Sequence, residues 1–235
     1  KGAANITLSY KCLDPSMLLR PIANESRIIA MSGTLSPIKI YSDLFGFEAE
    51  LKEYKDPFPK KNRLNIVIPN VTTKFTSRDD EMYSAIGKLA AEVTNAVPGN
   101  SIIFFPSYQM IDNISKYFNA KSEKTTFFEK PKLNKMEKEY IIENFKKYKS
   151  SGAVLLACAS GSFGEGIDLP GDYLKAVLIV GLPLAKPDLE ANEIIKYYDK
   201  KFGNGWDYGY IFPALTKCLQ NAGRCIRSET DKGAI

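Results

Sequence analysis

A run of six apolar residues passes directly into a glycine-rich turn in the segment Ala153-Val-Leu-Leu-Ala-Cys-Ala-Ser-Gly-Ser-Phe-Gly-Glu-Gly-Ile-Asp168. A run of this length that is apolar at every position is typical of a strand buried on both faces. Shorter runs of the same kind are Ser101-Ile-Ile-Phe-Phe105 and Ala176-Val-Leu-Ile-Val180. Because such strands need cover on both sides, they predict a parallel sheet between two layers of helices.

Segments with helical patterns separate these strands. Helices are predicted over residues 79–96, 108–118, 135–149, 188–201 and 213–228. Further strands are predicted over residues 6–12, 27–31, 64–68 and 125–128. An aromatic loop is expected at 203–212. The alternation predicts an α/β fold, a parallel sheet with helices on both faces. Ligands bind at the carboxyl ends of strands in such sheets, where residues 32–37, 106–108 and 161–168 are expected.

Composition narrows the classes of protein. The 235 residues are 44% hydrophobic, carry a formal net charge of +5 and include no histidine. That size fits one large α/β domain or a domain with a piece of another. The four cysteines are scattered, so we expect no metal site from this chain and a reducing, intracellular, cytoplasmic home. No apolar run reaches about 18 residues, which argues against membrane association. Because the chain begins at Lys1, we expect an excised piece of a longer protein.

A basic segment near the end of the chain is Gln220-Asn-Ala-Gly-Arg-Cys-Ile-Arg227. On a helix, Gln220, Arg224 and Arg227 would share one stripe. Two guanidinium groups on one face suit a phosphate, since each forms charge-assisted hydrogen bonds. The alternative is a solvated basic face with no ligand.

The glycine-rich turn at 161–168 allows a ligand close to the backbone. Hydroxyls at Ser160 and Ser162 suit phosphate oxygens, and Glu165 and Asp168 suit a metal-bound water or an arginine. A dinucleotide fingerprint is a poorer match, because the glycine order is G-x-x-G-x-G and Pro170-Gly171 follows where a long helix should begin. A plain turn is the remaining alternative.

Four motifs occur together in order: Ser32-Gly-Thr-Leu-Ser-Pro37, Phe105-Pro-Ser-Tyr108, Gly164-Glu-Gly-Ile-Asp168 and Gln220 to Arg227. This set resembles helicase motifs III to VI of the XPD/DinG branch of helicase superfamily two. The resemblance covers nearly the whole chain, and the histidine-free, Lys-rich composition resembles an archaeal member. It implies a RecA-like second helicase motor domain at 41–235, truncated at its C-terminus. Residues 1–40 before it would be either the end of the first motor domain or an N-terminal extension packed on the second.

Several family features are absent from the sequence. No G-x-x-x-x-G-K-[ST] loop, D-E-x-H box or cluster of four cysteines occurs. In the family these lie in the first motor domain and the iron–sulfur domain. The resemblance therefore implies ATP, Mg²⁺ and a 4Fe–4S cluster in the full protein, with no metal held here. The chain alone is not expected to hydrolyse ATP.

Carried over position by position, the resemblance implies catalytic roles for Arg224, Arg227 and Gln220. Both arginines would contact the γ-phosphate, with Arg227 as the preferred arginine finger, and Gln220 would orient the attacking water or an arginine. Residues Gly166, Asp168, Glu165, Thr34 and Ser36 would bind or couple to the nucleotide.

The family implies 5′-to-3′ unwinding in nucleotide excision repair. Expected partners are single-stranded DNA, the first motor domain and regulatory repair proteins. Candidate DNA contacts are Trp206, Tyr108, Ser107 and Ser162, with packing or helix capping as the competing role of each.

Two other functions remain alternatives. A Rossmann-type domain would bind a nucleotide or S-adenosylmethionine at the glycine-rich turn. A non-catalytic interaction module would present Arg224 and Arg227 to solvent or to a protein partner.

Overall fold

The computed structural model describes residues 8–235, which form two compact units. Unit 2 comprises Lys55–Ala185 and Ile211–Ile235, and unit 1 comprises the described residues up to Tyr54 together with Lys186–Tyr210. The expected boundary near residue 40 stays a prediction. Within residues 8–235, none of the helices combines the length and apolar character that crossing a bilayer requires.

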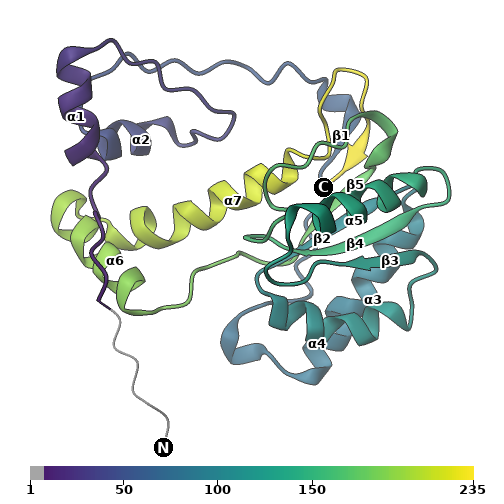
Figure 1. The fold of residues 1–235 in the computed structure, drawn as a ribbon. Coiled ribbons are helices and arrows are strands. Elements are labelled where there is room, and N and C mark those ends of the chain that lie inside the picture. Colours follow the sequence, from purple (N-terminus) through teal and green to yellow (C-terminus); the bar gives the residue numbers. More distant parts are fainter. Residues whose placement is uncertain (1–7) are drawn as a thin grey trace, which may run out of the picture. The chain divides into compact units, whose positions relative to one another are not determined.

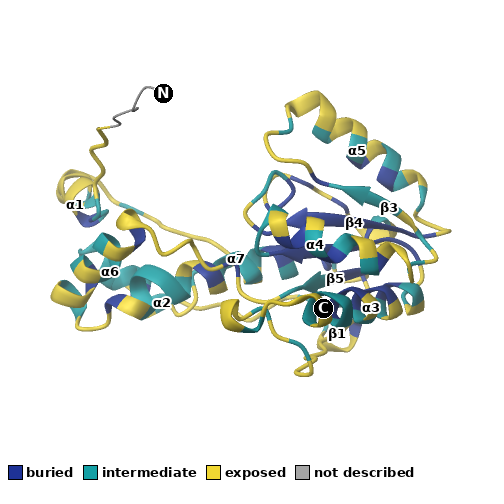
Figure 2. Cartoon of the chain, turned by 90° about the horizontal axis from the view of Figure 1, so that it is seen from below, coloured by how far each residue is buried: buried dark blue, intermediate teal, exposed yellow. Residues whose placement is uncertain are grey.

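Unit 2 is built on a six-stranded sheet in the order β1-β6-β5-β2-β4-β3, and every neighbouring pair is parallel (Figure 1). The strands are β1 Arg63–Leu64, β2 Ser101–Phe105, β3 Thr125–Phe128, β4 Ala153–Cys158, β5 Ala176–Ile179 and β6 Gly233–Ala234. The central strands β2 and β4 are buried at every position, and Figure 2 shows β4 in dark blue.

Alternate residues of these strands contribute to two hydrophobic clusters. On one side Phe104 and Leu155 pack with Phe145 of α5 (Lys135–Lys147). On the other, residues such as Ile103 and Leu156 pack against α3 (Asp80–Ala96) and α4 (Tyr108–Asn119). Helices therefore cover both faces, and the predicted α/β, RecA-like fold class is confirmed.

Short-range signals fix the helix starts in unit 2. The Asp79 and Ser107 side chains accept hydrogen bonds from the third residue beyond each, Met82 N and Met110 N. Asn134 and Glu137 form a reciprocal capping box at the start of α5. The predicted helices over 79–96, 108–118 and 135–149 agree with α3, α4 and α5 to within about two residues.

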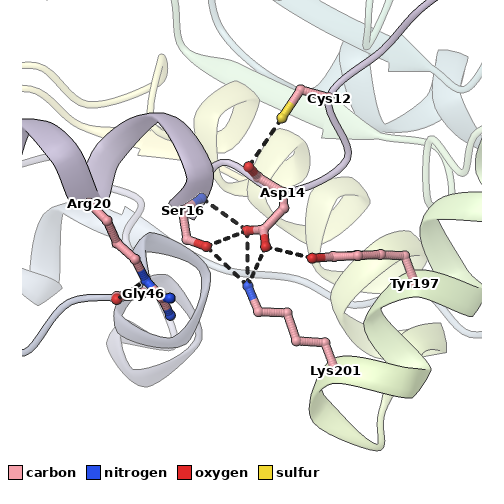
Figure 3. Close-up of polar contacts among 7 residues, drawn as sticks. All are labelled: Cys12, Asp14, Ser16, Arg20, Gly46, Tyr197 and Lys201. Carbon is pink, nitrogen blue, oxygen red and sulfur yellow. Dashed lines mark hydrogen bonds and ion pairs between the residues drawn. The ribbon is translucent and has the colours of Figure 1, made fainter.

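Unit 1 contains α1 (Ser16–Glu25), α2 (Ile38–Phe45), α6 (Leu189–Phe202) and all but the last residue of a π-helical turn, η4 (Asp207–Ile211). Buried Asp14 joins the segment before α1 to α6 (Figure 3). Its carboxylate accepts hydrogen bonds from Tyr197 Oη at 2.5 Å, from Lys201 Nζ at 2.8 and 2.9 Å, and from Ser16 Oγ at 2.6 Å. Burial alone would raise the pKa of Asp14, but these donors outweigh it and hold the pKa far below its usual range.

Two strands that the sequence predicts in unit 1 do not form, so these two predictions are wrong. Residues 27–31 are extended but unpaired, as are residues 8–12 of the predicted strand 6–12, whose first two residues lie outside the described part. Their apolar side chains are exposed, 90% for Ile29 and 98% for Leu8. A strand needs a neighbour for its backbone hydrogen bonds, and none of the described residues supplies one.

Three further predictions need correction. The helix predicted to run to residue 228 is α7, Phe212–Ala222. The expected aromatic loop at 203–212 is largely helical, because η4 runs directly into α7. The strand predicted over 64–68 is only β1, although Ile66 N also donates to Ile235 O at 2.8 Å.

Candidate functional site

The carboxyl ends of β2, β3 and β4 and the turn that follows α7 bring most of the predicted site residues together in unit 2. The central element is the glycine-rich loop, residues 159–168. It begins with two tight turns, in which Gly161 N donates to Cys158 O at 2.8 Å and Gly164 N donates to Gly161 O at 3.1 Å. A side chain at Gly164 would collide with the carbonyl of Ala159, so this tight path requires glycine there.

Arg224 holds the second half of the glycine-rich loop. Its guanidinium is buried and donates to the carbonyls of Ile167, at 2.8 Å, and Gly164. Its Nε–H has no hydrogen-bond partner within the described part of the chain. Burial, with the nearby positive charge of Arg227, lowers the pKa of Arg224. Two of its donors thus fix the backbone of the loop.

The prediction that Gln220, Arg224 and Arg227 share one helical stripe is wrong. Only Gln220 lies on α7, which is capped at Gly223. The backbone hydrogen bonds that follow are those of turns, from Arg224 N to Asn221 O at 3.2 Å and from Cys225 N to Ala222 O at 3.1 Å. The chain has to leave the helix here because it enters β6 ten residues later.

Buried Asp231 shapes the turn that carries Arg227. Its carboxylate accepts from Arg227 N at 2.8 Å, Ser228 N at 2.9 Å and Ser228 Oγ at 2.7 Å. Burial would raise the pKa of Asp231, but these hydrogen bonds lower it. Asp231 therefore fixes the backbone of Arg227 while the guanidinium remains accessible.

The Arg227 side chain is 41% exposed, and its Nε lies 3.9 Å from Oδ1 of exposed Asp168 in the glycine-rich loop. At that distance the pair is a weak surface contact. Arg227 is thus the arginine of this motif whose charge is accessible to a ligand.

Two lysines brace the outer part of the same loop. Lys217 Nζ of α7 lies 2.5 Å from Glu165 Oε1, and this contact lowers the pKa of Glu165. Lys138 of α5 donates to the carbonyl of Glu165 at 2.9 Å. Gly166, which has a φ of +66°, follows directly. The predicted coupling residues Glu165, Gly166 and Asp168 therefore lie on one loop held by cations.

The candidate DNA contacts of unit 2 adjoin the start of the loop. Ser107 caps α4, since its Oγ accepts from Met110 N at 3.3 Å. Half-buried Tyr108 donates from its hydroxyl to Glu129 Oε1 at 3.1 Å. Ser162 N donates to the same carboxylate oxygen. The Ser107 hydroxyl thus acts as a helix cap, which was its competing interpretation, whereas Ser162 is held through its backbone N–H.

The remaining predicted residues lie in unit 1. Thr34 and Ser36 belong to the turn after residues 27–31, where Thr34 Oγ1 lies 3.2 Å from Ser32 Oγ and Tyr41 Oη donates to Thr34 O at 3.3 Å. Trp206, 55% exposed, packs on Tyr210 with ring centroids 4.6 Å apart. Its exposure suits a platform for a base.

Glu129, Asn221, Asp231 and the bracing lysines were not predicted from the sequence. Buried Asn221 donates to Ala159 O at 3.3 Å and so ties α7 to the start of the loop. Glu129 had a usable signal, because a charged residue directly after the predicted strand 125–128 lies at the ligand-binding edge of the sheet. Across residues 8–235, no three His, Cys, Asp or Glu side chains are grouped as a metal site would require.

Comparison with known families gives a match over most of unit 2. The model of the helicase C-terminal domain family matches residues 90–235, which is more than half of the chain.

Individual relatives match a longer part of the chain. The helicase subunit XPD/RAD3 of the general transcription and DNA repair factor IIH of Saccharomyces cerevisiae is 26% identical over 252 residues, covering 98% of this chain and 32% of that protein. The XPD subunit of Dictyostelium discoideum is 29% identical and covers 96% of this chain and 31% of its own length. The chain thus spans about a third of the relatives that it matches.

Solved structures share the fold. An XPD helicase structure superimposes with a TM-score of 0.72 at 22% identity, covering 94% of this chain and 40% of the other. A structure of XPD without ligand gives a TM-score of 0.70 at the same identity.

Proposed function

The chain belongs to the helicase C-terminal domain family, as the order of its motifs indicated, and on that premise we propose that it is the second motor domain of an XPD-type, ATP-dependent DNA helicase. The parent protein, meaning the longer protein with both motor domains, would unwind DNA 5′ to 3′ in excision repair. This chain would contribute the arginine side of an ATP site between the two motor domains.

Arg227 is the proposed arginine finger. Its guanidinium is accessible, and its backbone is fixed by Asp231. Such an arginine neutralises charge on the γ-phosphate in the transition state of phosphoryl transfer. Arg224, expected from the resemblance to make a similar contact, has two donors engaged by loop carbonyls, which favours a positioning role. Gln220, half-buried on the last turn of α7, would orient the attacking water.

The residues present fit the outer end of a triphosphate, since accessible Arg227 offers a charged donor. Mg²⁺ would be held by the first motor domain, and the 4Fe–4S cluster by a part of the parent protein outside this chain. The bound metal would supply charge neutralisation at the β- and γ-phosphates.

The glycine-rich loop would connect nucleotide state to DNA. Glu165, Gly166 and Asp168 lie at its outer end beside Arg227, and Ser162 lies at its inner end beside Tyr108. Thr34 and Ser36 would relay between the nucleotide cleft and the DNA strand from the side of the first motor domain. Residues 8–12 and 27–31 would complete the sheet of that domain. Trp206 would stack on a base of single-stranded DNA, and regulatory repair proteins would be further partners.

A Rossmann-type nucleotide site agrees less well with the structure of the glycine-rich loop than the helicase proposal does. The loop is followed by the short 3₁₀ helix η3 (Gly171–Tyr173), where a dinucleotide site places the N-terminus of a long helix. A pure interaction module would leave the accessible charge of Arg227 without a role in catalysis.

The test is Arg227→Ala in the parent protein. We expect ATP turnover to fall about 10³-fold or more, with and without DNA, because loss of an arginine finger has effects of that size. The matched control is Arg78→Ala, which removes an exposed arginine far along the sequence from the motif and should leave turnover unchanged. Normal turnover in the folded Arg227→Ala variant would refute the proposed role.

A further inference from the structure

Glu129 is a buried carboxylate at the carboxyl end of β3, with only 3% of the residue exposed. It is the residue after the strand, and its backbone N–H still pairs with Leu156 O of β4 at 2.9 Å. This pairing therefore fixes the backbone position of Glu129 at the edge of the sheet.

Three donors from two other strand ends converge on this carboxylate. Oε2 accepts from Cys158 N at 2.8 Å, at the end of β4. Oε1 accepts from Ser162 N in the glycine-rich loop and from Tyr108 Oη, at 3.1 Å, at the start of α4. A buried carboxylate is costly unless it is hydrogen-bonded, and here its acceptors are engaged by backbone and hydroxyl donors.

The glycine at position 161 belongs to the same arrangement. A side chain on Gly161 would meet both carboxylate oxygens, at 2.6 Å for Oε2 and closer for Oε1. The loop backbone therefore passes directly over the carboxylate. Burial, together with the charge of Glu129, raises the pKa of Tyr108 above its ordinary value.

We propose that Glu129 is the positioning residue that couples the candidate DNA contact Tyr108 to the nucleotide-coupling end of the glycine-rich loop. It bridges the tyrosine to Cys158, the last residue of β4, and to Ser162 in the loop that follows, and Arg224 fixes the same loop further along. A shift of Tyr108 on binding DNA is thereby transmitted to the backbone that carries Glu165 to Asp168. This inference rests on the proposed helicase function.

The test compares ATP turnover of the parent protein with and without a single-stranded oligothymidylate. Glu129→Gln keeps the size of the side chain but replaces one acceptor with a donor, which cannot serve all three donors. We expect the ratio of DNA-stimulated to basal turnover to fall about tenfold or more, as misplaced site geometry does. In this chain alone, amide exchange at Ser162 and Cys158 should accelerate.

Tyr108→Phe provides a second, milder variant that leaves the carboxylate and both amides in place. It should lower the same ratio, and the double variant should be no worse than Glu129→Gln, because both changes break one link. Glu92→Gln, an exposed glutamate of α3, is the matched control.

Equal losses of basal and stimulated turnover in Glu129→Gln would mean that Glu129 only supports the fold, and an unchanged ratio in Tyr108→Phe would likewise overturn the inference. A failure of the helicase proposal would be seen in a separate experiment, since the Arg227→Ala variant would then hydrolyse ATP at the normal rate.

Discussion

Arg224 and Arg227 lie three residues apart yet have opposite surroundings. Arg224 is 6% exposed and bonded to the carbonyls of the glycine-rich loop, whereas the side chain of Arg227 is 41% exposed. Spacing on a helix could not separate them, because the helix ends at Ala222. One arginine therefore belongs to the architecture of the loop, and the other is accessible for a ligand.

This difference predicts different effects on stability. Arg224→Ala leaves two buried carbonyls, those of Gly164 and Ile167, without their donor, at a cost of about 1–3 kcal/mol. Amide exchange of β4 in this chain would report the loss. Arg227→Ala is the matched comparison and should change stability by less than about 0.5 kcal/mol. Equal stability of the two variants would contradict the assignment.

Trp206 leads to a prediction about DNA. Because the indole is more than half exposed, Trp206→Ala should leave folding intact. Binding of a single-stranded oligonucleotide to the parent protein should weaken by about 1–3 kcal/mol, the value of one stacked base, as measured by fluorescence anisotropy. Phe75→Ala, an equally simple loss of an exposed ring, is the control. Loss of the helical far-ultraviolet circular dichroism signal in Trp206→Ala would instead indicate a packing role.

At the level of elements, the sequence was informative wherever the pattern alone determines the structure. Strands such as 153–158 are apolar throughout and form as predicted. Residues 27–31 have a similar pattern, but no strand among residues 8–235 lies beside them, so they stay unpaired. The same limit applies to the site: motif order located the loop and the arginines, while Glu129 and Asp231 act through contacts between distant strand ends that no local pattern encodes.

The link between the segment before α1 and α6 should depend on pH. The pKa of Asp14 is lowered in the folded state, so its stabilising contribution is complete above its unfolded pKa of about 3.9 and is lost as pH falls below that value. Asp14→Asn should lower the free energy of unfolding of unit 1 by about 1.5–3 kcal/mol at pH 7. This gap in unfolding free energy between the variant and the wild type should narrow below about pH 4.

Urea unfolding of this chain can measure that gap, since the single tryptophan, Trp206, lies in unit 1 and reports on it by fluorescence. Glu25→Gln changes an exposed carboxylate of α1 and should show no gap at either pH. A gap for Asp14→Asn that is the same at pH 3 and pH 7 would exclude the ionised carboxylate as its source.

For the whole molecule, the informative feature is apolar surface without cover. Leu8, Tyr10, Ile29 and Met31 are each at least 86% exposed, on segments with the pattern of strands. If these segments complete the sheet of the first motor domain, amide exchange at residues 27–31 should be on the order of 10³-fold slower in the parent protein than in this chain. Peptides from α3 serve as the internal control. Equally fast exchange at 27–31 in both proteins would place these residues outside any sheet.

The position of β6 has a consequence for the order of assembly. It fills the gap between β1 and β5, and Arg63 pairs with Gly233, 170 positions later. Among the described strands β1 has no other neighbour, so during synthesis on the ribosome it must wait for almost all of unit 2 to emerge. Pairing across so many residues is slow because a long loop has to close first. The nascent chain therefore has an unpaired sheet edge at β5 until β6 is made.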